Sequence, residues 1–152
     1  MSYSELIEKN YAEAVEGIKE EWLKEPNTKW YEYVIGLPMQ LRICYLIVVF
    51  HNQIFNGGFN QYFVNGYGQF ATETVSALKK IGALEKADLL VDALKIANFE
   101  KFSDDTFRKQ LLEKKIARLF STEDLFESLD NRYYIDTSED LQKLLESYLR
   151  SI

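Results

Sequence analysis

Apolar side chains recur every three or four residues along most of the chain, the spacing that gathers them on one face of an α-helix. A first stripe of this kind runs from Ile7 to Trp22. It follows a Ser-x-x-Glu sequence, Ser2 to Glu5, which is typical of a helix N-terminus because each side chain can bond the other residue's backbone N–H. The pattern predicts one long helix that ends before Pro26.

Between residues 38 and 55 the apolar residues no longer form a stripe but fill nearly every position. The run from Ile43 to Phe50 contains no charged residue. Pro38 suits the first turn of a helix, where a backbone N–H would lack an intrahelical partner in any case. A helix that is apolar on every side is stable only when it is buried. We therefore expect a central, buried helix from about residue 38 to residue 55.

Helical spacing also accounts for the remaining segments, and no segment alternates polar and apolar residues as a half-buried strand does. The expected helices cover residues 28–35, 71–81, 83–98, 103–119, 121–133 and 136–149, with caps at Asn27 or Thr28, Ser103, Ser121 or Thr122, and Asp136 or Thr137. A chain of 152 residues, 47% of them hydrophobic, can bury one core without disulfides. The sequence therefore predicts a single all-helical domain, residues 1–152, with seven or eight helices around the central one.

A pair of glycines breaks the pattern where the central helix should end. Glycine adopts the left-handed backbone conformation without steric cost, so we expect Asn56, Gly57 and Gly58 to stop the helix. The segment after them combines aromatic rings at helical spacing with amides that can bond the backbone of a tight bend. The corner consists of Asn56, Gly57, Gly58, Phe59, Gln61, Tyr62, Phe63 and Asn65, with Asn60 and Tyr67 beside them. Two interpretations stay open: an amide network that holds the bend, and a small-ligand site or enzyme pocket within Asn56–Gly68.

The chain offers few residues for catalysis. His51 and Cys44 are its only histidine and its only cysteine, and seven residues along a helix separate them by roughly 10 Å. They cannot form the thiol–imidazole pair of a cysteine nucleophile if that helix is unbroken. A structural histidine near a helix end and an inert core thiol are favoured over a catalytic base and a nucleophile. We expect a non-enzymatic protein without a metal ion or cofactor.

Charge is distributed unevenly along a chain whose net charge is −6. Residues 1–25 carry seven acidic and three basic side chains and residues 119–152 carry eight and three, whereas residues 79–118 carry seven and ten. An acidic protein is unsuited to bind nucleic acid directly, since phosphate contacts need a basic surface. A basic protein is therefore the expected partner, and the candidate contact residues are Glu13, Glu16, Glu20, Asp136, Glu139 and Asp140. The alternatives are a solvated helix face for the N-terminal group, helix caps for the C-terminal group, and a homodimer.

The chain shows no sign of export or of membrane insertion. Its first residues lack the basic region and apolar run of a secretory signal. The longest apolar run, Ile43 to Phe50, falls short of the roughly 20 residues that cross a bilayer. We expect a cytoplasmic protein that does not bind membranes.

Four strings of residues stand out from the helical pattern. They are Asn56-Gly57-Gly58-Phe59-x-Gln61-Tyr62-Phe63-x-Asn65, Ala77-Leu78 ahead of Ile81-Gly82-Ala83, Leu129-Asp130-x-x-Tyr133-Tyr134 and Leu144-Leu145-x-x-Tyr148. Together they resemble a largely uncharacterised bacterial family named after a DNA-mimic protein, from about Leu41 to the C-terminus. The resemblance implies an all-helical domain and, as for the name-giving member, binding to a DNA-binding protein in place of DNA. The family tends to carry an acidic residue where this chain has Gln53, so no carboxylate role is expected there.

Overall fold

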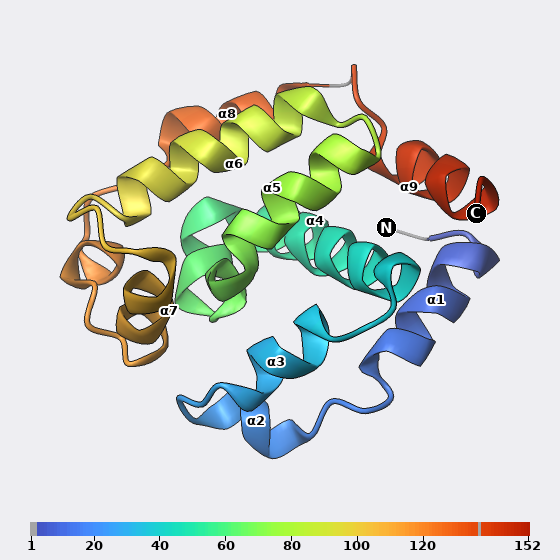
Figure 1. The fold of residues 1–152 in the computed structure, drawn as a ribbon. Helices are drawn as coiled ribbons and strands as arrows, with labels where there is room; N and C mark the ends of the chain where they lie inside the picture. Colours follow the sequence, from blue (N-terminus) through green and yellow to red (C-terminus); the bar gives the residue numbers. More distant parts are fainter. Residues whose placement is uncertain (1–2, 137) are drawn as a thin grey trace.

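The computed structural model describes residues 3–136 and 138–152, and within those ranges every regular element is helical. The α-helices are α1 (Glu5–Val15), α2 (Glu20–Lys24), α3 (Lys29–Ile35), α4 (Met39–Val64), α5 (Ala71–Lys80), α6 (Leu84–Ala97), α7 (Asp104–Leu112), α8 (Glu127–Ile135) and α9 (Leu141–Arg150). Two short 3-10 helices, η1 (Tyr67–Phe70) and η2 (Ala117–Phe120), lie between them. The predicted all-helical fold is confirmed (Figure 1).

The first half of α4 is the centre of the fold, as its apolar sequence predicts. Every residue from Ile43 to His51 is buried. Helices α1, α5, α8 and α9 pack against α4, which runs through the middle of the molecule (Figure 1). Neighbours on all sides explain why this helix has no polar stripe. None of the described helices combines the length and the hydropathy that would let it cross a membrane.

The N-terminal stripe forms two helices rather than the single one predicted. α1 ends at Val15, and Trp22 belongs to the separate helix α2. The hydroxyl of Tyr33, on α3, donates to the Ala14 carbonyl at 2.7 Å and accepts from the Gly17 N–H at 3.2 Å. These bonds satisfy backbone groups at the end of α1. A contact with α3 therefore stabilises the C-terminal end of α1, which comes earlier in the chain than predicted.

Polar side chains from the preceding residues cap α1, α3 and α7. The Asn27 side-chain oxygen accepts from two backbone N–H groups at the start of α3, at 2.8 and 3.2 Å. Ser103 accepts from the Thr106 N–H at the start of α7, as predicted. α1 is capped by Ser4, whereas the predicted cap Ser2 lies outside the described residues.

The C-terminal third departs from the predicted boundaries. α7 ends at Leu112, and Lys114 has a positive φ of 58°, so the stripe predicted to reach Leu119 is divided between α7 and η2. Residues 121–126 form turns and bends, and α8 begins after them. Ser121 and Thr122 therefore do not cap a helix, and the prediction of a helix over 121–133 was wrong in its first half.

The last helix is capped by Asp140, whose side chain accepts from a backbone N–H in the first turn of α9. The predicted cap Asp136 bonds to Ser138 instead, and Thr137 lies outside the described residues. α9 packs against both α1 and α4. The first and last helices of the chain therefore lie side by side (Figure 1).

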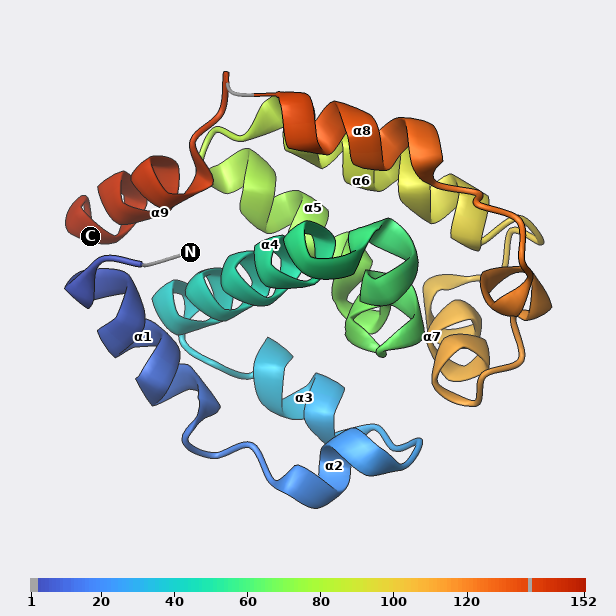
Figure 2. The same cartoon turned by 180° about the vertical axis from the view of Figure 1, so that it is seen from behind.

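α4 bends at its glycine pair. Gly58 has φ 79° and ψ −176°, a backbone conformation that is essentially restricted to glycine. Helical backbone resumes at Phe59 and continues to Val64. Figure 2 shows the ribbon of α4 turning and continuing in a new direction. The glycines thus turn the chain as predicted, but they join two helical segments rather than ending the helix.

Candidate functional site

The bend in α4 is held by α8, which comes from the far end of the chain. The Phe59 N–H, directly after the bend, donates to Asp130 Oδ1 at 2.8 Å. The Tyr134 hydroxyl donates to the Ile54 carbonyl, four residues before Gly58, at 2.8 Å. In an unbroken helix the N–H of residue 59 would bond the carbonyl of residue 55. Asp130 supplies the replacement and caps the second half of α4.

The bend also leaves no room for a side chain at Gly58. A Cβ atom on Gly58 would lie 2.5 Å from Asp130 Oδ2. Burial raises the pKa of Asp130 above its usual value, and the hydrogen bond from Phe59 partly offsets that shift. The carboxylate is therefore held against a position that has no room for a side chain.

Tyr133 completes the contact between the two helices. Its hydroxyl shares a hydrogen bond with His51 Nδ1, 2.6 Å away. Its ring centroid lies 5.8 Å from that of Phe50 and 6.1 Å from that of Phe59, both in edge-to-face arrangements. We call this contact region the α4–α8 joint; it consists of His51, Ile54, Gly58, Phe59, Asp130, Tyr133 and Tyr134. Two of the four sequence strings therefore meet in space.

The predicted amide network at the corner forms across the bend. Gln53 Oε1 accepts from both Gln61 Nε2 and Asn65 Nδ2, each at 3.0 Å. Asn56 Nδ2 donates to Gln61 Oε1 at 3.5 Å. Asn60 is exposed, as is Asn56, but among the described residues its side chain has no hydrogen bond within this network. The aromatic members Phe59, Tyr62 and Phe63 are fully buried. These amides connect the segment before the glycines to the segment after them, but they bond one another and Gln53 rather than the backbone groups of the bend that the sequence predicts as their partners.

A hollow of about 480 Å³ borders one side of the corner. Asn65 and Tyr67 line it together with Gln53, whereas Asn56 and Gln61 do not. The ligand site considered from the sequence would have used all four of the predicted residues. The structure thus places Asn65 and Tyr67 on a hollow, while Asn56 and Gln61 belong, with Asn65, to the amide network.

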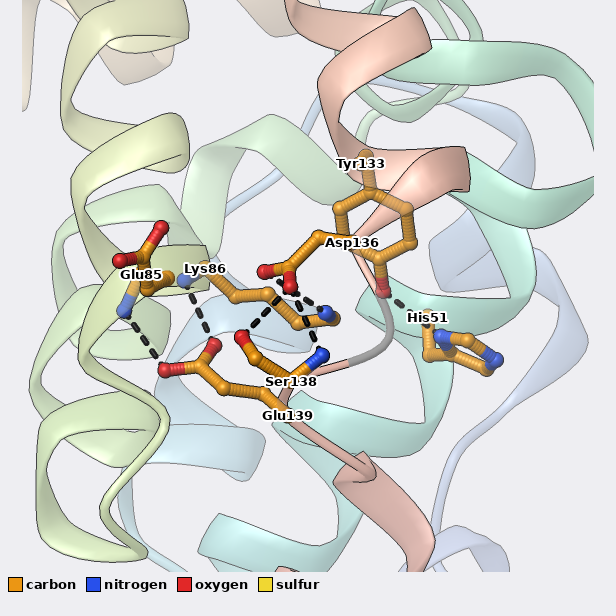
Figure 3. Close-up of polar contacts among 7 residues, drawn as sticks. All are labelled: His51, Glu85, Lys86, Tyr133, Asp136, Ser138 and Glu139. Carbon is orange, nitrogen blue, oxygen red and sulfur yellow. Dashed lines mark hydrogen bonds and ion pairs between the residues drawn. The ribbon is translucent and has the colours of Figure 1, made fainter.

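A second polar cluster joins α6 to the segment between α8 and α9. Lys86, on α6, is only 3% exposed. Its Nζ lies 3.8 Å from Asp136 Oδ2 and 4.9 Å from the centroid of the Tyr133 ring. Figure 3 shows the Lys86 side chain extending toward Asp136, with Tyr133 and His51 close by. A buried ammonium group requires a counter-charge, and here a carboxylate and an aromatic face provide it.

The C-terminal acidic residues predicted as partner contacts are bonded within the protein. The two oxygens of Glu139 accept from two N–H groups in the first turn of α6, at 2.7 and 2.9 Å (Figure 3). Bonds from Ser138, assisted by Lys86, lower the pKa of Asp136, and Asp140 caps α9. Glu139 and Asp140 therefore match the alternative that these carboxylates stabilise helix ends, whereas the Asp136 carboxylate is held by Ser138 and Lys86 rather than at a helix end.

The N-terminal acidic residues are placed differently. Glu13, Glu16 and Glu20 are all exposed. Glu20 lies 3.8 Å from Lys24 in a pair of which both side chains are largely in solvent, where ion pairs contribute little. Among the described residues, no ion pair involves Glu13 or Glu16. Of the six acidic candidates, these three are available to a partner.

The single histidine should make stability depend on pH. Burial lowers the pKa of His51 below its usual 6.5, the Lys86 charge adds to the shift, and Asp140 opposes it. Below about pH 6.5 the histidine is therefore protonated in the unfolded chain but still neutral in the folded protein. The free energy of unfolding falls as the pH drops from about 6.5 toward the pKa of His51 in the folded protein. Denaturant titrations at pH 7.5 and 5.5 should show this loss, and the His51→Gln protein should lose less. Equal losses in the two proteins would show that His51 does not titrate as described.

Two residues of these clusters were not identified from the sequence. Asp130 belongs to a recognised string, but nothing in that string shows that it caps a helix 71 residues away. Lys86 lies between Glu85 and Ala87 on an amphipathic helix, and no sequence signal marks it as buried. Within the described residues, no group of three His, Cys, Asp or Glu side chains could hold a metal ion.

Comparison with known proteins identifies the family. The profile of the DMP19-like protein family matches residues 36–152. No curated protein and no solved structure matches the chain. The matched segment contains the whole α4–α8 joint, whereas α1, α2 and α3 precede it. Since the match covers well over half of the chain, the protein belongs to the DMP19-like protein family.

Proposed function

We propose that the protein is a non-enzymatic binding module that engages a basic, DNA-binding protein in place of DNA. The observation that carries this proposal is the exposure of Glu13 on α1, Glu16 at the C-cap of α1 and Glu20 at the start of α2. Residues three apart on a helix have Cβ atoms about 5–6 Å apart, comparable in scale to the phosphate spacing of a DNA strand. A basic surface that binds phosphates can therefore bind these carboxylates.

The internal bonds of the C-terminal acidic residues exclude them from the proposed contact surface. Asp136, Glu139 and Asp140 would have to abandon helix caps and a buried ion pair to meet a partner. Such bonds are costly to break when one partner stays buried. The proposed contact surface is therefore α1 and α2, which precede the segment that matches the family.

The single cysteine and the single histidine of the chain are both buried. Cys44 is fully buried, and burial raises the pKa of its thiol to about 12, so it does not form a thiolate at neutral pH. His51 bonds to Tyr133 within the α4–α8 joint. These placements favour a binding protein over an enzyme that uses either side chain.

The proposal is tested by a triple substitution with a charge-matched control. Glu13→Gln, Glu16→Gln and Glu20→Gln together should weaken binding to captured basic proteins about tenfold at low salt, because three exposed charges facing the partner are removed. The control carries Glu100→Gln, Glu123→Gln and Glu127→Gln, which are also exposed and change the net charge equally. The chain is immobilised, exposed to cytoplasm from its own source, and the captured proteins are titrated back at two salt concentrations.

Two results would contradict the proposal. Unchanged affinity in the α1–α2 triple variant would show that these carboxylates do not contact the partner. Equal weakening in the two triple variants would show that net charge alone matters.

A further inference from the structure

We propose that the hollow between α4, α6, α8 and α9 binds a small amino-acid-like zwitterion with an apolar or aromatic side chain. The hollow has a volume of about 330 Å³, at the lower end of the range of ligand pockets. It is lined by His51, Lys86 and Tyr133 and by the carboxylates Asp136 and Asp140. This site is separate from the α1–α2 surface, so each proposal can fail without the other.

The first observation is a set of buried polar atoms without hydrogen-bond partners. Lys86 Nζ, Asp136 Oδ2 and His51 Nε2 have no such partner among the described residues, and all three side chains line this one hollow. Buried polar groups are normally hydrogen-bonded, and a buried ion pair such as Lys86–Asp136 is favourable only when further hydrogen bonds satisfy its atoms. Lys86 Nζ lies 3.8 Å from Asp136 Oδ2, which is too far for a hydrogen bond. The hollow is therefore lined by a donor, Lys86 Nζ, and an acceptor, Asp136 Oδ2, that could both form hydrogen bonds with a ligand.

The chemistry of these atoms defines the ligand. The Lys86 ammonium group can only donate, so it requires an acceptor such as a carboxylate. Asp136 Oδ2 can only accept, and the exposed Asp140 carboxylate adds negative charge at the edge, so both favour an ammonium group. A molecule with a carboxylate and an ammonium group a few bonds apart satisfies both requirements.

The rim of the hollow offers rings to the rest of such a ligand. Phe55 and Tyr134 line it and are 57% and 45% exposed. Their ring centroids lie 6.1 Å apart in an edge-to-face arrangement. Exposed rings next to these polar groups suit a ligand whose apolar side chain packs on the rings while its charged end meets Lys86 and Asp136.

His51 provides a direct probe, because it is the only histidine of the chain. Protein labelled with ¹⁵N only in histidine gives the NMR signals of a single imidazole ring, and that ring lines the hollow. The probes are the twenty common L-amino acids, with acetate and methylammonium as separate halves of the zwitterion. We expect saturable shifts of the His51 signal with apolar or aromatic amino acids. Acetate and methylammonium should each bind at least about tenfold more weakly, since each satisfies one charge only.

Variants distinguish this site from binding elsewhere. Lys86→Met removes the charge and keeps the length of the side chain, and should weaken binding about tenfold or more. Phe55→Ala changes an exposed ring and should weaken it several-fold without unfolding the protein, so the test holds even if Lys86→Met fails to fold. Phe99→Ala, at a ring that is 66% exposed and outside the hollow, is the matched control and should bind normally.

Three outcomes would overturn the proposal. No shift with any amino acid would mean that water alone fills the hollow. Shifts that persist unchanged in Phe55→Ala and Lys86→Met would place binding elsewhere. Equal binding of acetate and of whole amino acids would remove the requirement for an ammonium group.

Discussion

Replacing Gly58 by alanine should lower the free energy of unfolding by about 3 kcal/mol, the combined effect of backbone strain and of a displaced carboxylate. The φ of 79° at this position is unfavourable for any residue with a Cβ atom. The new methyl group would also lie 2.5 Å from Asp130 Oδ2. Asp130 would have to move, which leaves the Phe59 N–H without its partner. Thermal unfolding should shift downward by about 6–12 °C.

Gly82→Ala is the matched control for this substitution. Gly82 has a φ of 90°, but the nearest atom to an added Cβ is Leu144 Cδ2 at 4.0 Å. It should therefore lose only the strain contribution, about 1–2 kcal/mol. Comparing the two alanine variants separates backbone strain from the clash with Asp130. If Gly58→Ala were no more destabilising than Gly82→Ala, the carboxylate would not be held as tightly as the structure shows.

Replacing Phe59 by alanine should destabilise the protein by about 3–5 kcal/mol, the usual range for a fully buried aromatic residue. Phe59 is 0% exposed, and its ring contacts those of Phe50, Phe126 and Tyr133. It therefore links both halves of α4 to α8. The loss should appear in the midpoint of denaturant unfolding with little change in its slope.

Phe55→Ala, four residues earlier on the same helix, provides the comparison. Its side chain is 57% exposed, and its ring lies near those of His51 and Tyr134. We expect a loss of about 0.5 kcal/mol, as for most exposed positions. Similar losses for the two phenylalanines would mean that the α4–α8 joint does not carry the stability assigned to it.

The helical class and the central helix follow from local sequence information. Continuous apolar residues from Ile43 to Phe50 leave no polar face, so burial of this helix could be predicted from pattern alone. The turn at Gly58 could also be predicted, because glycine is preferred where φ is positive. That the helix resumes at once depends on Asp130, which lies 71 residues away and caps the second segment. Periodicity contains no information about such a distant contact.

The helix ends were less predictable for the same reason. α1 ends at Val15 where the Tyr33 hydroxyl bonds both sides of the break, although the apolar stripe continues to Trp22. The Lys86 cluster likewise depends on where α6 and the segment after α8 meet, which no local pattern specifies. The C-terminal acidic candidates are bonded within the protein and the N-terminal ones are exposed, and this difference depends on tertiary contacts. The charge pattern of the sequence alone gives no reason to prefer the N-terminal group over the C-terminal group as partner contacts.

The most direct test of the proposed function is a competition between this protein and duplex DNA. A DNA-binding protein captured on the immobilised chain is exposed to increasing concentrations of a duplex that it recognises. If the α1–α2 carboxylates occupy its DNA site, the duplex should release it completely, and no complex of all three components should form. A stable ternary complex would show that the two ligands use different sites and would contradict DNA mimicry.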